Sequence, residues 1–292
     1  MPQDGGRYFD GTLGDGGHAR ALLEASSPGG ELSGTDLDGH AITRLSKEFE
    51  RYGKRVHFFH ANFTEIDRIC TSLGWKHLNG ILIDLGMSSY ELDDGARGFS
   101  FSRTGPLDMR FSQHKDLDAY QVVNTYDQEH LAHLIRTNGE ERFARRIARR
   151  IVELRPIATT SELSDVVCSA IPRRFWPKKI HPATKTFQAI RMEVNKELDN
   201  LREFLPKASS LLSPGGVLAV ISYHSLEDRM VKQFFTGTRP GVTYPRGLPV
   251  PEKTHALRFE RMTRKPITAS PEEVQINPRA RSARLRAARR VS

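Results

Sequence analysis

The sequence predicts an α/β fold, Rossmann-like with a mostly parallel sheet, that is interrupted by an inserted all-helical domain. Three observations predict it. Short apolar runs alternate with amphipathic helical stretches as far as residue 85. Strand signals are then lost between residues 107 and 196, where one helical periodicity follows another. They return at residue 217, so we expect one domain from residues 1–106 and 197–292 and a second from residues 107–196.

A glycine-rich loop follows the first expected strand. Tyr8 and Phe9 favour a strand, and residues 19–25 favour a helix. Gly14, Gly16 and Gly17 lie between them, and glycines let a backbone pass close to a ligand. The N–H groups at the start of the helix face the same place. The loop therefore predicts a site for a nucleotide-like cofactor, with a tight turn that holds no ligand as the alternative.

The second expected strand, residues 30–37, contains an acid near its end. Asp36 lies about 20 residues beyond the glycines, where a carboxylate suits the two hydroxyls of a ribose. Two adenosine cofactors fit this pattern, a nicotinamide dinucleotide and S-adenosylmethionine. Asp10 and Asp15 place carboxylates where a pyrophosphate would lie, so charge repulsion favours the cationic sulfonium of S-adenosylmethionine.

Three further residues follow or end expected strands. Phe63 follows the strand at residues 56–60 and could stack on an adenine or belong to the core. Asp84 ends the apolar strand at residues 80–85, where it could accept a hydrogen bond from the group to be methylated, cap a helix or form a salt bridge. His224 follows the strand at residues 217–222, as a catalytic or substrate-binding residue or as a histidine packed against a turn.

The C-terminal region predicts an antiparallel hairpin. Residues 256–265 and 282–291 alternate between apolar and polar side chains, as strands do. Such a hairpin would extend the parallel sheet at one edge.

The insert predicts a basic surface. In a helix over residues 140–155, Ile147 and Ile151 share one side and a row of arginines shares the other. The row consists of Arg142, Arg145, Arg146, Arg149 and Arg150. Lys178, Lys179 and Lys185 follow, with Phe175 and Trp176 among them. Cations with interleaved aromatic rings are typical of nucleic-acid surfaces, although a solvated helix face is the usual role of such a row.

Composition narrows the partners and the compartment. The chain has 292 residues and a net charge of +9, which suggests a polyanionic partner. Its two cysteines, far apart in sequence, argue against zinc and fit a reducing compartment. No apolar run approaches the roughly 20 residues of a membrane span, and the N-terminus lacks a signal-peptide core. We therefore expect a cytoplasmic protein with no metal and no membrane partner.

Several motifs together resemble one family. They are residues 10–18 (DGTLGDGGH), 84–89 (DLGMSS), 97–101 (RGFSF), 105–110 (GPLDMR), 139–142 (GEER), 181–189 (HPATKTFQA), 224–229 (HSLEDR) and 277–282 (NPRARS). The combination resembles the RsmH (MraW) family of 16S ribosomal RNA (cytosine-N4)-methyltransferases nearly end to end. The resemblance implies a class I S-adenosylmethionine-dependent fold and methylation of a cytidine amine in the decoding region of the small subunit.

The resemblance also implies roles for particular residues. The cofactor-binding residues would be Gly16, Gly17, His18, Asp36, Phe63, Asp84 and, where the family usually has Gln, Glu91. Asp84 would be the hydrogen-bond acceptor for the amine, with Asp108 and His224 as further catalytic candidates. A ring that stacks on the substrate would come from Phe99, Phe101 or Tyr90.

The partners implied are small-subunit ribosomal RNA in an assembled subunit and, as an open alternative to a monomer, a second copy of the chain. The family's segment before the first strand, with a His and a Pro-Val-Leu run, is not in this sequence. It would supply part of the pocket wall or of a dimer surface. Two other functions stay open, a non-catalytic RNA-binding ribosome assembly factor and an amino-methyltransferase that acts on DNA or a small molecule.

Overall fold

A computed structural model describes residues 2–87, 94–101, 103–113, 115–237 and 259–291. The chain divides into two compact units. The sheet unit comprises Met1–Gly86 and Leu198–Ser292, and the helical unit comprises Met87–Glu197. The sequence placed the start of the insert at residue 107. The division lies earlier because Phe99 is already part of the buried core of the helical unit.

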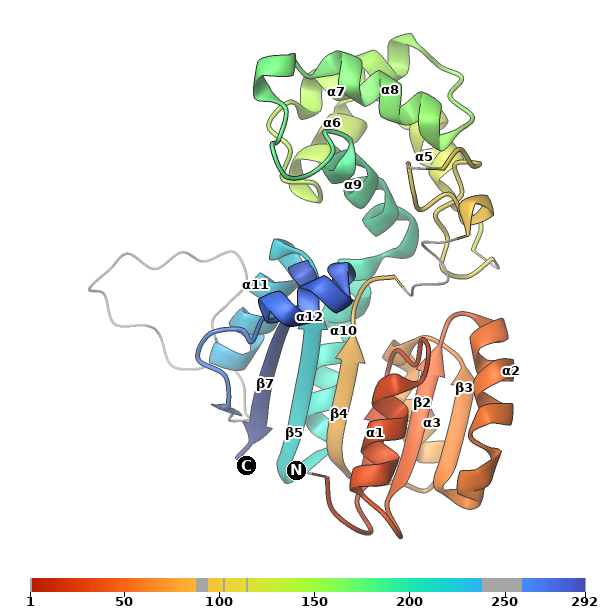
Figure 1. Cartoon of the computed structure of the whole chain (residues 1–292), viewed down its shortest axis with the longest axis vertical. Helices are drawn as coiled ribbons and strands as arrows, with labels where there is room; N and C mark the ends of the chain where they lie inside the picture. Colours follow the sequence, from red (N-terminus) through yellow and green to blue (C-terminus); the bar gives the residue numbers. More distant parts are fainter. Residues whose placement is uncertain (1, 88–93, 102, 114, 238–258, 292) are drawn as a thin grey trace, which may run out of the picture. The chain divides into compact units, whose positions relative to one another are not determined.

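The sheet unit is built on one seven-stranded sheet with the order β3-β2-β1-β4-β5-β7-β6 (Figure 1). Its strands are β1 (Arg7–Asp10), β2 (Glu31–Asp36), β3 (Val56–His60), β4 (Leu78–Asp84), β5 (Leu212–Ser222), β6 (Phe259–Arg261) and β7 (Arg284–Arg290). The first five pair in parallel, and β7 pairs antiparallel with both β5 and β6. The predicted class I α/β fold and its C-terminal antiparallel pair are therefore confirmed.

The strand register brings several polar strand ends to one edge. Asp10 of β1 lies opposite Gly34 of β2 and Leu82 of β4. Asp84 of β4 lies opposite Ile221 of β5. In an open α/β sheet ligands bind at the carboxyl ends of the parallel strands, so this edge is the place to look for a site.

Helices cover the sheet through two buried clusters. One cluster joins Tyr8 and Leu32 of the sheet to α1 (Gly17–Ala25) and α2 (Gly39–Glu48). The other joins Phe9, Ile81 and Val220 to three further helices. These are α3 (Ile66–Ser72), α10 (Glu197–Leu211) and α11 (Ser225–Thr236). Because successive residues of a strand face opposite sides, Tyr8 and Phe9 contribute to different clusters.

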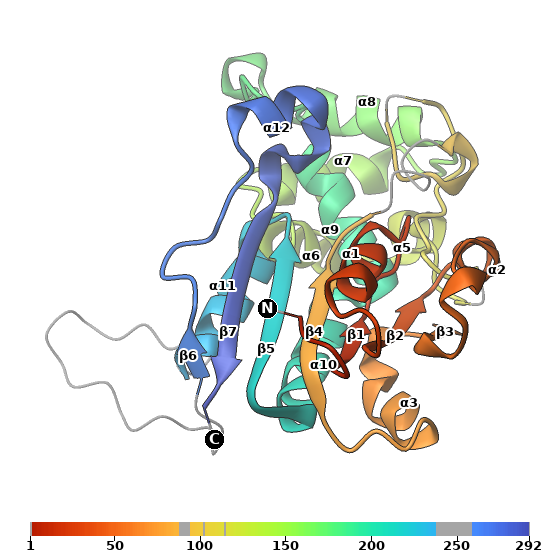
Figure 2. The ribbon, with the colours of Figure 1, turned by 60° about the horizontal axis from the view of Figure 1, so that its bottom comes forward.

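Short elements complete this unit. They are the 3₁₀ helices η1 (Glu50–Arg55), η2 (Phe63–Glu65) and η5 (Pro278–Ser282) and the α-helix α12 (Pro271–Ile276). Strand β5 begins five residues before the expected position, because Leu212 already pairs with Leu78 of β4. Figure 2 shows β7 running beside β5, with the short β6 on its outer side.

A buried ion pair joins β7 to α11. The Arg286 guanidinium donates from Nε to Asp228 Oδ1 at 2.6 Å and from Nη2 to Oδ2 at 3.1 Å. Only 7% of Arg286 and 9% of Asp228 is exposed. This two-point contact fixes the antiparallel strand to the helix that follows β5.

The helical unit has its own core. Its elements are η3 (Gly95–Arg97), α5 (Ala119–Thr125), α6 (Gln128–Thr137), α7 (Ala144–Glu153), α8 (Thr160–Ala170), η4 (Arg173–Phe175) and α9 (Thr184–Asn195). The expected helix from residue 140 begins only at Ala144. Glu140 has φ +49°, and the Glu141 carboxylate accepts a hydrogen bond from Phe143 N at 2.8 Å, so the chain turns before the helix starts.

In the described part of the chain no helix is long and apolar enough to cross a lipid bilayer.

Candidate functional site

The glycine loop after β1 is shaped by backbone conformations that suit glycine. Gly16 precedes α1 with φ +76°, and a Cβ atom there would lie 2.6 Å from Leu45 Cδ2. Gly14 has φ +49°, and its N–H donates to Asp36 Oδ2 at 2.8 Å. The acid that the sequence assigned to a ribose, from its spacing after the glycines, therefore lies beside the glycine loop.

Gly16→Ala is expected to lower the free energy of unfolding by about 1–3 kcal/mol, because the new methyl group meets Leu45 and the residue has positive φ. Urea unfolding measures this. Gly17→Ala is the control for stability, because a Cβ at Gly17 has no atom within 4 Å. Equal unfolding free energies for the two variants would contradict the steric role of Gly16.

Asp36 accepts two backbone hydrogen bonds. Besides the one from Gly14, its Oδ1 accepts from Asp38 N at 2.8 Å. Burial raises the pKa of Asp36, and these backbone donors oppose that rise. Asp36 thus connects the end of β2 to the loop after β1.

Asp84 occupies the end of β4 beside two titratable side chains. Its Oδ2 lies 3.6 Å from His18 Nε2, and this contact with Asp84 raises the pKa of His18. Burial and then the neighbouring Asp84 carboxylate raise the pKa of Tyr223, which follows β5. Asp84 Oδ1 is buried and accepts no hydrogen bond from the residues that the structure describes. One carboxylate oxygen is thus a buried acceptor without a donor in the described part of the chain.

Thr12 connects Asp84 to the acid at the end of β1. The backbone N–H of Asp84 donates to Thr12 Oγ1 at 2.6 Å, and Thr12 N donates to Asp10 Oδ1 at 3.1 Å. Asp10 is completely buried, and its Oδ2 has no hydrogen-bond partner within the described ranges. Burial raises the pKa of Asp10 to about 7. The sequence placed Asp10 near the cofactor by charge alone, and its complete burial was not predicted.

The stability of the fold is expected to depend on pH through Asp10. Its pKa is about 7 in the folded chain and about 3.9 in an unfolded chain, so between these values the folded state holds more protons. The contribution of Asp10 to stability is therefore present below about pH 4 and is lost at roughly 1.4 kcal/mol per pH unit as the pH rises toward 7.

Asp10→Asn is expected to remove this slope, which urea unfolding between about pH 5 and pH 7 measures. Around Asp10, His18 acts against the raised pKa, and Asp84 and Asp36 add to it. The exposed Asp15 on the same loop supplies the control variant, Asp15→Asn, which should keep the wild-type slope. An unchanged slope in Asp10→Asn would contradict the assignment.

Phe63 lies between the site and the core. It is half-buried, and its ring meets that of Phe204 edge to face, with centroids 5.1 Å apart. Gly11 permits this approach, because a Cβ there would lie 2.9 Å from Phe63 Cβ. The core contact is thus observed, and the stacking of Phe63 on adenine stays a prediction.

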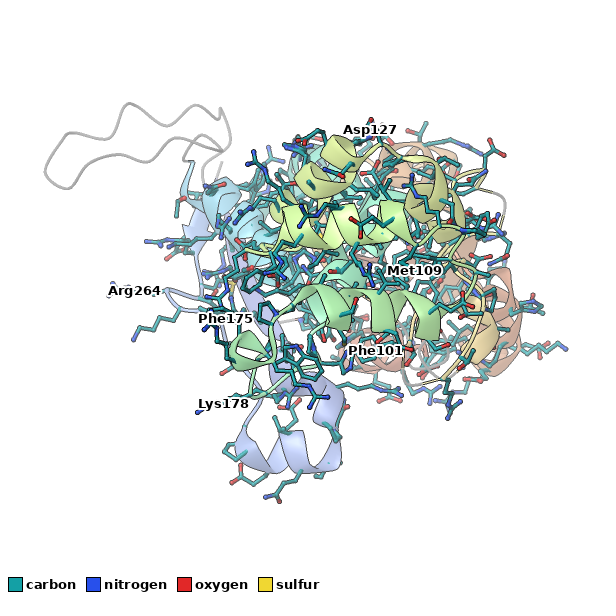
Figure 3. The ribbon with its side chains drawn as sticks, turned by 90° about the horizontal axis from the view of Figure 1, so that it is seen from above. Phe101, Met109, Asp127, Phe175, Lys178 and Arg264 are labelled. Carbon is teal, nitrogen blue, oxygen red and sulfur yellow. The ribbon has the colours of Figure 1, made fainter. Side chains whose placement is uncertain are left out.

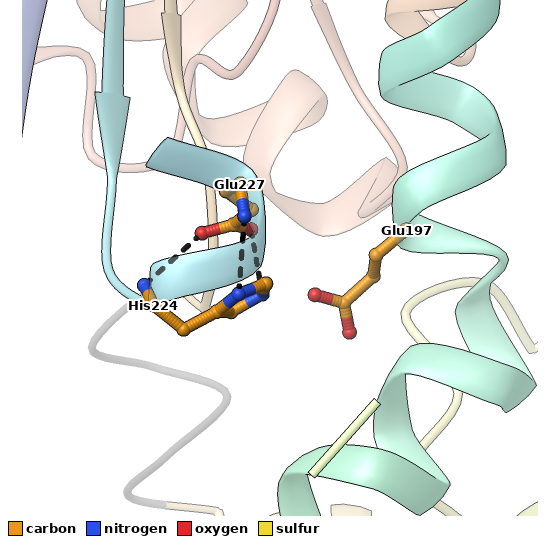
Figure 4. Close-up of side chains that lie close together, drawn as sticks. All are labelled: Glu197, His224 and Glu227. Atoms are coloured by element: carbon orange, nitrogen blue, oxygen red, sulfur yellow. Dashed lines mark hydrogen bonds and ion pairs between the residues drawn. The ribbon is translucent and has the colours of Figure 1, made fainter. Parts of the chain in front are cut away.

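His224 holds the turn that follows β5. It is 8% exposed and caps α11, with Nδ1 accepting from Glu227 N at 3.4 Å and Nε2 3.1 Å from Glu227 Oε1 (Figure 4). Glu227 Oε2 in turn accepts from Tyr223 N at 3.0 Å. His224 thus packs against a turn, the alternative that the sequence left open. Tyr223 was not among the residues predicted from the sequence, although its position directly after β5 was a usable signal.

The other predicted site residues belong to the segment of the helical unit. Asp108 is held by Arg110, with Nη2–Oδ2 2.8 Å and Nε–Oδ1 3.0 Å. Burial raises the pKa of Asp108, but the hydrogen bonds from Arg110 outweigh it and lower the pKa overall. Phe99 is buried and stacks on Phe111, and Phe101 stacks on His181. Glu91 and Tyr90 lie outside the described residues.

The basic face of α7 is observed. Ala144, Ile147, Ala148 and Ile151 are buried, and the five predicted arginines are exposed, four of them on α7 and Arg142 just before it. Arg149 and Arg150 both approach Glu153, at 4.0 and 3.2 Å. Lys185 Nζ donates to Glu140 O at 2.9 Å. Lys178, which is labelled in Figure 3, and Lys179 are exposed on the segment between α8 and α9.

Comparisons with known proteins agree on one family. The model of the MraW methylase family matches residues 1–291. A protein of Syntrophotalea carbinolica named ribosomal RNA small subunit methyltransferase H is 48% identical, over 99% of this chain and 93% of that protein. Proteins with the same name from Geobacter sp. and Thermomicrobium roseum are 46% and 47% identical, over 99% and 100% of this chain and 94% and 90% of their own lengths.

Proposed function

Because this chain belongs to the MraW methylase family, we propose that it transfers a methyl group from S-adenosylmethionine to the N4 amine of a cytidine in the decoding region of small-subunit ribosomal RNA. The observation that carries the proposal is Asp84 Oδ1, a buried acceptor at the carboxyl end of β4 that lacks a donor among the described residues. An amine that approaches this oxygen would supply the donor.

The residues at the sheet edge fit a cationic adenosine cofactor. Asp10 Oδ2 and Asp84 Oδ1 are both buried acceptors without hydrogen-bond donors in the described part of the chain. Two such carboxylates suit the sulfonium and ammonium groups of S-adenosylmethionine and disfavour a diphosphate. Asp36 would accept from the ribose hydroxyls, Gly16, Gly17 and His18 would line the loop, and Phe63 would border the adenine. When bound, the cofactor supplies an activated methyl group on sulfur.

Asp84 would make the amine reactive. The lone pair of cytosine N4 is delocalised into the ring, so the amine is a poor nucleophile. Asp84 Oδ1 would accept one N4 hydrogen, which favours a pyramidal and more nucleophilic nitrogen, and the N4 proton would pass to Asp84. His18 Nε2 lies 3.6 Å from this carboxylate and Tyr223 neighbours it, and Glu227 accepts a hydrogen bond from the backbone of Tyr223. Positioning and electrostatics would supply most of the rate.

The helical unit would bind the RNA substrate. Its exposed arginines on α7 and the lysines near residue 178 suit phosphates, and Arg binds phosphate through a planar fork. The substrate would be the assembled small subunit in the cytoplasm. Sedimentation of the purified protein distinguishes a monomer from a homodimer.

Labelled S-adenosylmethionine tests the function directly. The protein is incubated with small-subunit particles, naked ribosomal RNA and DNA in parallel, and the product is digested to nucleosides. We expect label in N4-methylcytidine from the particles. RNA binding without transfer to any substrate would instead support a non-catalytic assembly factor, and label in DNA alone would support a DNA amino-methyltransferase.

A further inference from the structure

On the surface of the helical unit, the guanidinium groups of two arginines lie over one exposed aromatic ring. Phe175, in η4 between α8 and α9, is 39% exposed and is labelled in Figure 3. The guanidinium carbon of Arg142 lies 4.5 Å from its ring centroid, and that of Arg174 lies 4.9 Å from it. Arg142 also lies 4.7 Å from the centroid of Phe143, whose ring centroid is 5.4 Å from that of Phe175.

The described contacts of these two guanidinium groups are with aromatic rings rather than with carboxylates. Neither Arg142 nor Arg174 forms an ion pair with a carboxylate in the part of the chain that the structure describes. Arg149 and Arg150 on α7 differ, because both approach Glu153. A guanidinium that stacks on a ring uses its face for that contact and keeps its in-plane N–H donors for another acceptor.

The surrounding segment is uniformly basic. Residues 171–181 contain Arg173, Arg174, Lys178 and Lys179 and no Asp or Glu. Arg173 lies 5.6 Å from the ring centroid of Trp176, which repeats the stacked arrangement next to Phe175. Such a segment attracts a polyanion, and the planar guanidinium of Arg142 or of Arg174 can bind phosphate oxygens bidentately.

We propose that Arg142 and Arg174, both held over the ring of Phe175, form a phosphate clamp whose two guanidiniums bind phosphodiesters of the RNA substrate. The clamp rests on the proposed RNA-directed function and assigns one binding contact within it. The role of Phe175 is positioning, since it limits the rotamers of two long side chains before the RNA arrives and so lowers the entropy that binding costs.

The test measures binding of small-subunit RNA to the full chain by fluorescence anisotropy at several salt concentrations. Phe175→Leu keeps every charge and an apolar side chain of similar reach but removes the π face. We expect it to weaken RNA binding about 5-fold, because both stacked guanidiniums lose their support. Arg142→Gln and Arg174→Gln should each weaken binding and reduce the slope of log Kd against log salt by about 1.

The control is Arg51→Gln in the sheet unit. Arg51 also lies over a ring, 4.8 Å from the centroid of Tyr52, but it is 3.8 Å from Glu24. We expect the Arg51→Gln variant to match the wild type in RNA affinity and in the slope of log Kd against log salt. Thermal unfolding of each variant confirms that the fold is kept.

The outcomes separate the two proposals. If the wild type binds RNA and methylates small-subunit particles while Phe175→Leu binds like the wild type, the clamp is wrong and the proposed function stands. The same holds if Arg142→Gln and Arg174→Gln leave the salt slope unchanged. If the wild type neither binds nor methylates RNA, the proposed function fails first and the clamp fails with it.

Discussion

Asp84→Asn is expected to lower the rate of methyl transfer at least about 100-fold, the lower range for the loss of a positioned proton acceptor. The amide keeps the size of the side chain, but its NH₂ group cannot accept a hydrogen from N4. Asp84 Oδ1 is the buried oxygen that lacks a donor among the described residues, so the loss is expected at the chemical step. Single-turnover rates with saturating S-adenosylmethionine and small-subunit particles measure it.

A matched acid at the same end of the sheet provides the control. Asp38 caps α2 by accepting from His40 N at 2.9 Å, and Asp38→Asn should keep the wild-type rate. Cofactor affinity is measured separately by calorimetry, because Asp84 is also expected to border the cofactor. Near-normal turnover of Asp84→Asn with intact cofactor affinity would show that Asp84 is not the acceptor.

Asp228→Ala is expected to lower the free energy of unfolding by about 3–5 kcal/mol, because it leaves the buried charge of Arg286 without a partner. Urea unfolding of the full chain, followed by circular dichroism, measures the loss. The size of the effect follows from burial, since 7% of Arg286 is exposed and water cannot replace the lost carboxylate.

Two further variants show whether the loss comes from the unpaired charge. The double variant Asp228→Leu with Arg286→Met replaces the pair by apolar side chains and should recover most of the stability. The exposed pair of Arg202 and Asp199 serves for comparison, and Asp199→Ala should cost less than about 1 kcal/mol. A cost below about 1 kcal/mol for Asp228→Ala would mean that the buried pair does not hold β7 in place.

The convergence of the acids could be predicted from sequence because each follows a strand that the apolar pattern reveals. Asp10, Asp36 and Asp84 end β1, β2 and β4, and the carboxyl ends of parallel strands meet at one edge. The contacts of Tyr223 and His224 could not be predicted. Strand periodicity ends at Ser222, and the direction of the next side chains depends on how Glu227 binds the turn.

In the helical unit, too, the sequence predicts local patterns but not contacts between distant segments. The exposed arginine face of α7 follows from 100° per residue, which needs only the sequence. The meeting of Arg142 with Phe175 needs the path of the chain between α8 and α9, which no local pattern contains. Likewise Phe99 joined the helical core although it precedes the expected boundary, because burial there depends on partners distant in sequence.

Thr12 limits how far the chemistry of this sheet edge can be redesigned. Its backbone amide fixes Asp10 and its hydroxyl fixes the backbone of Asp84, so a single residue sets the spacing between two carboxylates on neighbouring strands. An engineer who moves one acid to accept a different alkyl donor would displace the other. Changes in donor choice and in nucleophile choice at this edge should therefore come as linked pairs of substitutions rather than one at a time.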